Sequence, residues 1–299
     1  MKRSIAFFSL IWCGVLVPGH GQELRQLLQP IFQPGKTYRF ISNTNVYMAP
    51  PQEPERQIIM EQQMRYDADP RGDQGKGVAL RGLTERLRVN INSGGKEVSY
   101  DSLKKENQTS VLGRHFESTV NRYVKLELDE KMRITSHQEA GRSGAATPLP
   151  ELPRFGPEEL VQLISGLPQG YSPDPVKMGD EWVLKGKRPV GELGQLGFEI
   201  SYRHLGMIDH EGHACIAIEF RGQMTGDIGD ENSQSIDFQG SSITGRILYD
   251  LTEKMTRYSE HNVFMNVNIP EKNGGGDRSV PMTQKGVLQL MQIVKKKAK

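Results

Sequence analysis

Cysteine is scarce in this sequence, with only Cys13 and Cys215 among its 299 residues. We expect Cys13 to be removed with a leader segment, so the mature chain has one cysteine and no internal disulfide. A chain of this length buries a sizeable core without one. Cys215 lies in the strand-like run Ala214–Ile218, which indicates a small core residue and not a nucleophile.

Catalytic signatures and net charge are lacking as well. The mature chain has no Gly-x-Ser-x-Gly, no complete phosphate-loop motif and no Gly-x-Gly-x-x-Gly. Lys2 and Arg3 are the only basic residues of the leader, so the 38 basic and 36 acidic residues of the whole chain become 36 of each. A neutral chain offers no electrostatic footprint for nucleic acid. The one basic run, Lys295–Lys299, is interpreted as a solvated tail.

The N-terminus has the pattern of a secretory signal. Lys2 and Arg3 precede the apolar run Ile5–Val17, and Pro18 and two small glycines follow it. The run is too short to span a bilayer, which takes about 20 apolar residues. We expect cleavage near Gly21 and a periplasmic or extracellular protein that does not span the membrane.

Alternation of apolar and polar residues predicts antiparallel strands in both parts of the mature chain. The clearest examples are residues 58–66, 87–91, 198–202 and 216–220. Helices are predicted for Gln108–Thr119 and after Pro157, with one or two helical turns in Gln22–Gln33. The fold class is therefore mainly β (α+β).

We predict two related curved sheets, each with about one helix. The division is a signal peptide (1–21), an N-terminal β-rich half (22–140), a linker with a short helix (141–175) and a C-terminal β-rich half with a basic tail (176–299). An internal repeat supports it: Leu128–Met132 recurs as Leu251–Met255, 123 residues later, with four of five residues identical.

The joint between the halves, Asp174-Pro175-Val176-Lys177-Met178-Gly179-Asp180-Glu181-Trp182, carries a resemblance to a known family. With the signal peptide and the paired β-rich halves, it resembles an uncharacterised family of exported bacterial proteins, the domain of unknown function number six-two-six-three. The resemblance implies an envelope location and supplies no catalytic residues. The expected fold is also loosely similar to the half-barrels of periplasmic lipoprotein carriers, whose curved sheets hold an apolar ligand.

One cluster has residue types that suit a metal site: His204, Asp209, His210, Glu211, His213 and Cys215. Its spacing matches no standard metal motif, because His210 and His213 are not one helical turn apart. We therefore interpret it as a polar hairpin turn and assign no catalytic, cofactor or metal residue. Asp67, Asp69 and Asp73 resemble part of a calcium loop but lack the closing glutamate, which favours a solvated turn.

The function expected from the sequence is that of an exported, non-enzymatic envelope protein. It would bind an apolar ligand or another envelope protein on its curved sheets and use no cofactor. The alternative is a metal-dependent hydrolase that uses the His204 to Cys215 cluster. Met60, Met64, Met224 and Met265 suit an adaptable apolar surface, but their pattern favours ordinary core packing. The sequence indicates no oligomeric state.

Overall fold

The structure, a computed structural model, describes residues 25–51, 53–71, 77–120, 122–140, 157–189, 195–227, 240–270 and 277–296. It confirms the mainly β, antiparallel class. The strands are β1 (Lys36–Met48), β2 (Arg56–Pro70), β3 (Val78–Ser93), β4 (Lys96–Asp101), β5 (Tyr123–Leu128), β6 (Ile134–Ala140), β7 (Glu181–Pro189), β8 (Gln195–His210), β9 (His213–Asp227), β10 (Ser242–Asp250), β11 (Met255–Pro270) and β12 (Asp277–Lys295); the helices are α1 (Lys105–Gln108), α2 (Val111–Val120) and α3 (Pro157–Gly166).

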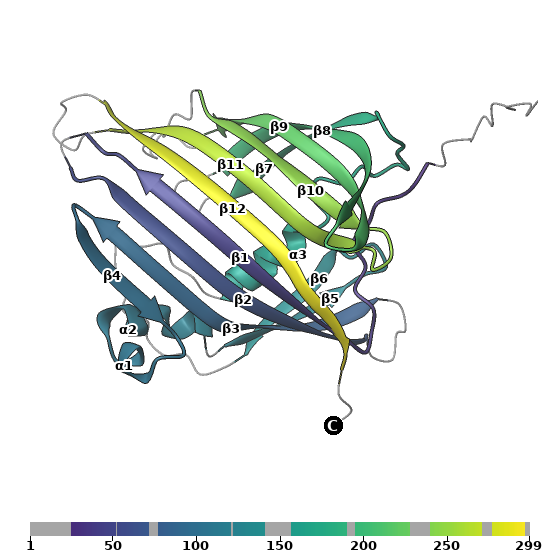
Figure 1. Cartoon of the computed structure of the whole chain (residues 1–299), viewed down its shortest axis with the longest axis horizontal. Helices are drawn as coiled ribbons and strands as arrows, with labels where there is room; N and C mark the ends of the chain where they lie inside the picture. The colour runs from purple at the N-terminus through teal and green to yellow at the C-terminus, as the bar shows by residue number, and fades with distance from the viewer. Residues whose placement is uncertain are drawn as a thin grey trace, which may run out of the picture.

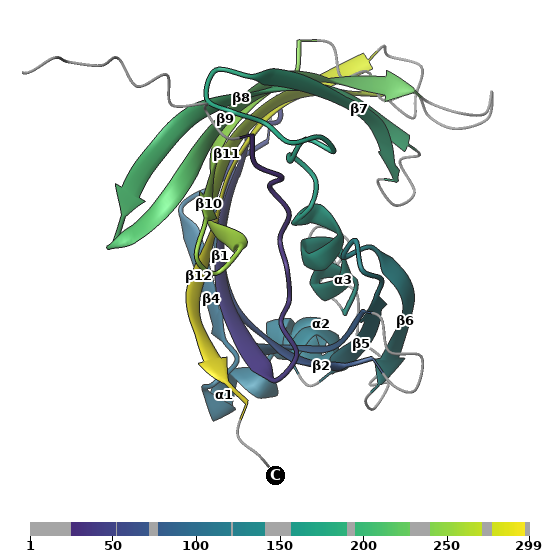
Figure 2. The same ribbon diagram turned by 90° about the vertical axis from the view of Figure 1, so that its right-hand side faces the viewer.

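The strands form one open sheet in the order β6-β5-β3-β2-β1-β12-β11-β10-β9-β8-β7, and β4 pairs with β3 at one side. The first strand pairs with the last, so the two predicted halves are consecutive meanders joined at β1 and β12 (Figure 1). The sheet curls strongly and has a concave and a convex face (Figure 2). The division into domains at residues 140 and 175 stays a prediction.

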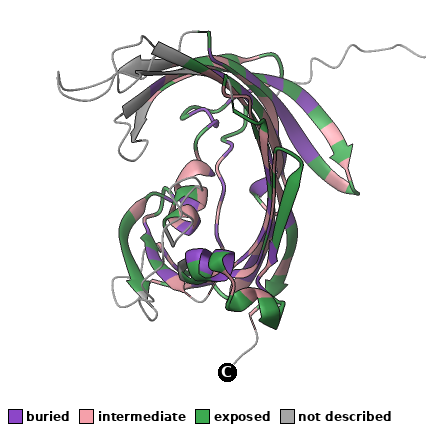
Figure 3. Cartoon of the chain, turned by 90° about the vertical axis from the view of Figure 1, so that its left-hand side faces the viewer, coloured by how far each residue is buried: buried purple, intermediate pink, exposed green. Residues whose placement is uncertain are grey.

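Buried residues lie along the strands of the curled sheet and on the helices inside the curl (Figure 3). Three buried clusters there each combine sheet residues with a covering segment. Helix α3 covers the cluster around Tyr66, and α2 covers the one around Val89. The Tyr66 hydroxyl donates a hydrogen bond to the Leu160 carbonyl oxygen at 3.0 Å, which fixes α3 to the sheet. The apolar stripe predicted for this helix is confirmed, because Leu160 and Ile164 are buried.

An extended N-terminal strap, residues 25–35, covers the third cluster and reaches the first. It lies on the inner side of the sheet beside α3 (Figure 2). Gln26 forms an isolated antiparallel bridge with Val176 in the joint. Leu28 and Phe32 are each 2% exposed, while Leu27 is 53% exposed. The helical turns predicted for Gln22–Gln33 are therefore wrong for residues 25–33, because docking on the sheet outweighs the local spacing of the leucines.

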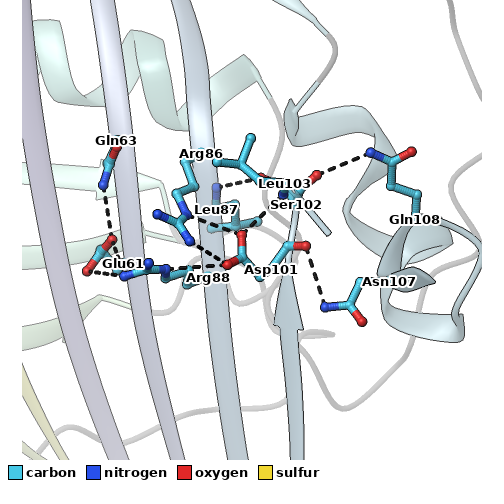
Figure 4. A network of polar contacts seen from close by, with 10 residues as sticks. All are labelled: Glu61, Gln63, Arg86, Leu87, Arg88, Asp101, Ser102, Leu103, Asn107 and Gln108. Atoms are coloured by element: carbon cyan, nitrogen blue, oxygen red, sulfur yellow. Dashed lines mark hydrogen bonds and ion pairs between the residues drawn. The ribbon is translucent and has the colours of Figure 1, made fainter. Parts of the chain in front are cut away.

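Charged side chains alternate in one row across the convex face. Glu181, Arg203, Glu219, Arg246 and Glu260 are directly opposed neighbours on β7 to β11. Opposite charges in such positions stabilise the pairing and keep this face in water. The row resumes on β2, β3 and β4, where Glu61, Arg88 and Asp101 are opposed and belong to the network in Figure 4.

The repeated pentapeptides occupy equivalent places, the β5–β6 and β10–β11 turns. In each turn an aspartate accepts two backbone N–H bonds and pairs with an arginine of the same turn or the following strand: Asp129 with Arg133, and Asp250 with Arg257. Met132 and Met255, which end the two pentapeptides, lie in the same buried cluster. The repeat therefore marks two turns with similar roles.

Several predicted segments lie outside the described residues: the signal peptide, the linker residues 141–156, Asp73 and the last three residues of the basic tail. The start of that tail differs from the prediction. Lys295 ends β12, and the Lys296 ammonium lies 2.6 Å from a carboxylate oxygen of Asp69. This ion pair holds the end of the chain against β2.

Candidate binding site on the concave face

The residues of the His204 to Cys215 cluster do not converge. The His204 side chain is buried, and its Nδ1 accepts a hydrogen bond from the Gly206 N–H at 3.0 Å. Glu211 and Gly212 form a two-residue turn between β8 and β9 with φ values of 53° and 79°. Positive φ at both positions is typical of a type I′ hairpin turn. The polar hairpin interpretation is therefore confirmed for this part of the cluster.

His213 and Cys215 lie near one buried acid, Asp250. The Asp250 carboxylate is 3.0 Å from His213 Nδ1 and 2.7 Å from Arg257 Nη2. Burial and the neighbouring Asp250 carboxylate raise the pKa of the Cys215 thiol to about 11, and the residue is fully buried. A protonated, inaccessible thiol cannot act as a nucleophile at neutral pH.

Metal ligands do not gather anywhere in the described part of the chain. No group of three or more His, Cys, Asp or Glu residues there could hold an ion. Asp67 and Asp69, the described members of the supposed calcium loop, have protein partners. Asp67 accepts a hydrogen bond from the Thr37 hydroxyl at 2.7 Å, and Asp69 pairs with Lys296. The described residues thus give the hydrolase alternative no metal centre.

A cavity of about 450 Å³ lies between α3 and the middle of the concave face. The strands that form its floor, β1, β2, β10, β11 and β12, come from both meanders, so it exists only because β1 pairs with β12. Its lining consists of Ser42, Thr44, Gln62, Met64, Glu159, Gln162, Leu163, Gly166, Leu167, Gln169, Ile247, Thr256, Ser259, His261, Gln284, Gly286, Val287 and Leu288.

Polar side chains form a band across this floor between apolar clusters. Gln62 is buried and donates a hydrogen bond from Nε2 to the Thr84 hydroxyl at 2.9 Å. The other members of the polar band make no side-chain hydrogen bond with any described residue, so their donors and acceptors are available to a ligand. These members are Ser42, Thr44, Ser259, His261 and Gln284.

His261 occupies a place in the polar band that Gly286 makes possible. It is opposed by Gly245 on β10 and by Gly286 on β12. A Cβ at Gly286 would meet the imidazole ring, so the lack of a side chain there leaves room for it. Burial lowers the pKa of His261 below its usual 6.5. The ring is therefore neutral at pH 7 and carries one donor and one acceptor nitrogen.

The chemistry of the lining suits an amphipathic, uncharged ligand. Met64, Leu163, Leu167, Ile247 and Leu288 offer apolar surface next to the polar band. No Lys or Arg is among the described residues that line the cavity, and Glu159 on α3 is its one carboxylate. An anion would gain no opposite charge here, whereas hydroxyl or amide groups would find partners.

Sequence reasoning missed this site. His261 lies in β11 and Gln284 in β12, and the sequence pattern singled out neither residue. The detectable signal was the polar residue on an apolar face: Gln62 interrupts Ile58, Met60, Met64 and Tyr66 at the same parity. Such an interruption in a buried strand indicates a functional or structural polar contact.

Comparisons with known proteins found no family model and no curated protein that match the chain. Solved structures show distant similarity. One concerns lipid–protein interactions in lipovitellin (TM-score 0.48, 12% identity, covering 90% of this chain and 26% of that one), so this chain spans about a quarter of the lipovitellin length. Another is DynF of the dynemicin biosynthesis pathway of Micromonospora chersina (0.22, 7%, 90% and 86%). A third is the MucA/MucB complex of Pseudomonas aeruginosa (0.15, 7%, 87% and 94%).

None of the described helices combines the length and the apolar character needed to cross a membrane. The proposals that follow depend on the geometry of the chain's own residues.

Proposed function

We propose that this protein is an exported, non-enzymatic binding protein of the bacterial envelope that holds an apolar or amphipathic ligand on its concave face. The observation that carries the proposal is the cavity under α3, where unpartnered polar groups adjoin apolar side chains. Ligand sites commonly combine a mostly apolar wall with a few placed polar groups. Export rests on the leader sequence and on the resemblance to the exported family.

Ligand binding is favoured over a flat protein–protein contact because α3 and the sheet face each other across the cavity. A ligand inside it would be contacted from two sides by Leu163 of α3 and Leu288 of β12. The convex face, by contrast, carries the alternating charge row, in which Glu181, Arg203 and Glu219 are exposed.

The test uses a naphthylamine dye whose emission rises in apolar surroundings, together with native mass spectrometry of protein purified from its own envelope. Thr44→Trp fills the cavity, and Asn43→Trp is its matched control because the neighbouring residue points to the convex face. We expect the wild type and the Asn43 variant to bind dye and co-purified ligand. Binding in the Thr44 variant should fall at least about tenfold, which corresponds to about 1.4 kcal/mol.

Equal binding by both variants would overturn the proposal, and so would a protein that carries no ligand and binds no dye. Export is tested separately by N-terminal sequencing of the protein from the envelope fraction. A mature chain that begins at Gln22 is the expected result, and an intact leader would contradict export.

A further inference from the structure

The concave face extends beyond the polar band. Farther along the same strands, Met48, Met282 and Met265 occupy directly opposed positions on β1, β12 and β11, and we call them the methionine row. Each lies an even number of residues from a cavity residue on its own strand: Thr44, Gln284 and His261. Side chains two or four positions apart on a strand share a face, so the methionine row continues the floor of the cavity.

Met265 and Met282 belong to an apolar cluster without a cover among the described residues, whereas Met48 packs against the cluster around Val89 that α2 covers. Val263 and Met265 form the buried centre of the uncovered cluster, and Met224, Ile243 and Met282 pack against them. All its members come from strands, whereas the other concave clusters each include residues of a helix, the strap or the joint. Methionine adapts its shape to irregular apolar partners better than branched side chains do.

The distance between the polar band and the methionine row sets the length of a ligand that reaches both. Four residues separate His261 from Met265, and Thr44 from Met48, which at about 3.3 Å per residue is about 13 Å. An extended hydrocarbon chain with C–C bonds of about 1.5 Å and staggered torsions covers that span with about ten carbons.

We propose that the ligand is a single-chain amphiphile with an uncharged, hydrogen-bonding head group. Its head lies in the polar band, and its chain runs between β1 and β11 along β12 to the methionine row. The neutral His261, the free hydroxyls and Gln284 match a hydroxyl or amide head. The absence of Lys and Arg from the described lining, together with Glu159, disfavours a carboxylate. This inference deepens the proposed function and rests on it.

The experiment measures the affinity of monoacylglycerols with chains of about eight to about sixteen carbons. Burying each methylene should raise affinity about fourfold, until the chain spans the distance to the methionine row at about ten carbons. Beyond that length, each additional methylene should raise the affinity much less. Fatty acids of the same length should bind about tenfold more weakly at pH 7.

Variants of the methionine row test whether the end of the ligand's hydrocarbon chain lies there. In Met48→Gln/Met282→Gln, whose replaced side chains are only half-buried, we expect the affinity of chains of about ten carbons or more to fall about tenfold or more. The shortest chain should change less than about twofold. Met207→Gln, which alters a methionine that is 67% exposed, is the control and should leave the series unchanged. Met265→Gln offers a second variant if the double variant does not fold.

Several outcomes overturn this inference while leaving the proposed function intact: affinity independent of chain length, tighter binding of fatty acids, or an equal loss for all chain lengths. A monomer–dimer equilibrium that Met265→Gln abolishes would assign the methionine row to a second copy, which also overturns it. If no amphiphile of any length binds the wild type, the proposed function itself fails.

Discussion

Asp250 and Arg257 form an ion pair, with 2.7 Å between Oδ2 and Nη2, inside the protein. Their side chains are 0% and 8% exposed. Burial opposes the charge on Asp250, but hydrogen bonds from the Glu253 N–H and Arg257 keep its pKa below the usual value. Arg257 also donates to the Leu290 carbonyl oxygen at 3.4 Å, so the pair links the β10–β11 turn to β12. That link lies beside the β1–β12 junction on which the cavity depends.

Asp250→Asn should therefore cost about 3–5 kcal/mol of unfolding free energy, because it leaves the buried guanidinium without its counter-charge. Glu181→Gln, which removes a carboxylate from an exposed pair with Arg203, should cost no more than about 1 kcal/mol. Urea unfolding of both variants provides the comparison. Similar losses would show that the buried pair has no special role.

Lowering the pH should reduce the free energy of unfolding in part through protonation of Asp101. Its hydrogen bond with Arg86 is the main cause that lowers its pKa from 3.8 to about 2. Because the folded pKa is below the unfolded one, the stabilisation is complete above about pH 4 and is lost as the pH falls toward about 2. Asp101→Asn should flatten this part of the stability curve. Glu97→Gln, on the same strand, is the control, and an unchanged slope in Asp101→Asn contradicts the prediction.

The strap should contribute stability through its buried side only. Leu28→Ala removes a side chain that is 2% exposed and should lower the unfolding free energy by about 2–5 kcal/mol. Its neighbour Leu27 is 53% exposed, so Leu27→Ala should change it by less than about 0.5 kcal/mol. Thermal unfolding distinguishes them, and equal effects would show that the strap is not docked as described.

Gly286 and His261 should be energetically coupled. A methyl group at Gly286 would meet the imidazole ring, so Gly286→Ala should destabilise the protein by about 1–3 kcal/mol. In the His261→Ala background the ring is absent and there is no clash. Adding Gly286→Ala to His261→Ala should therefore lower the free energy of unfolding by much less than Gly286→Ala does alone. A double-mutant cycle measures the coupling. Additive effects would mean that the glycine is not needed to accommodate the ring.

Strand class and the two faces were predictable because alternation is local. Ile58 and Tyr66 reveal the buried side of β2 without knowledge of their partners. Pro157 and the two acids after it likewise predicted α3. The strap was misread because Leu24, Leu27, Leu28 and Ile31 have helical spacing, and only docking shows that Leu28 is buried and Leu27 exposed.

The site could not be predicted for a different reason. Thr44 and Gly286 are neighbours across a strand pair but lie more than two hundred residues apart in the chain. Neither the polar band nor the methionine row exists in any one segment. Both appear only when β1 pairs with β12, and periodicity does not report which strands pair.

The most direct test of ligand binding on the concave face is photo-cross-linking with a monoacylglycerol that carries a diazirine at the end of a chain of about ten carbons. After irradiation, peptide mass spectrometry locates the label. We expect it on the peptides that contain Met265 and Met282, with unlabelled monoacylglycerol suppressing it. Labelling confined to convex-face peptides, or labelling that the competitor does not reduce, would contradict the claim.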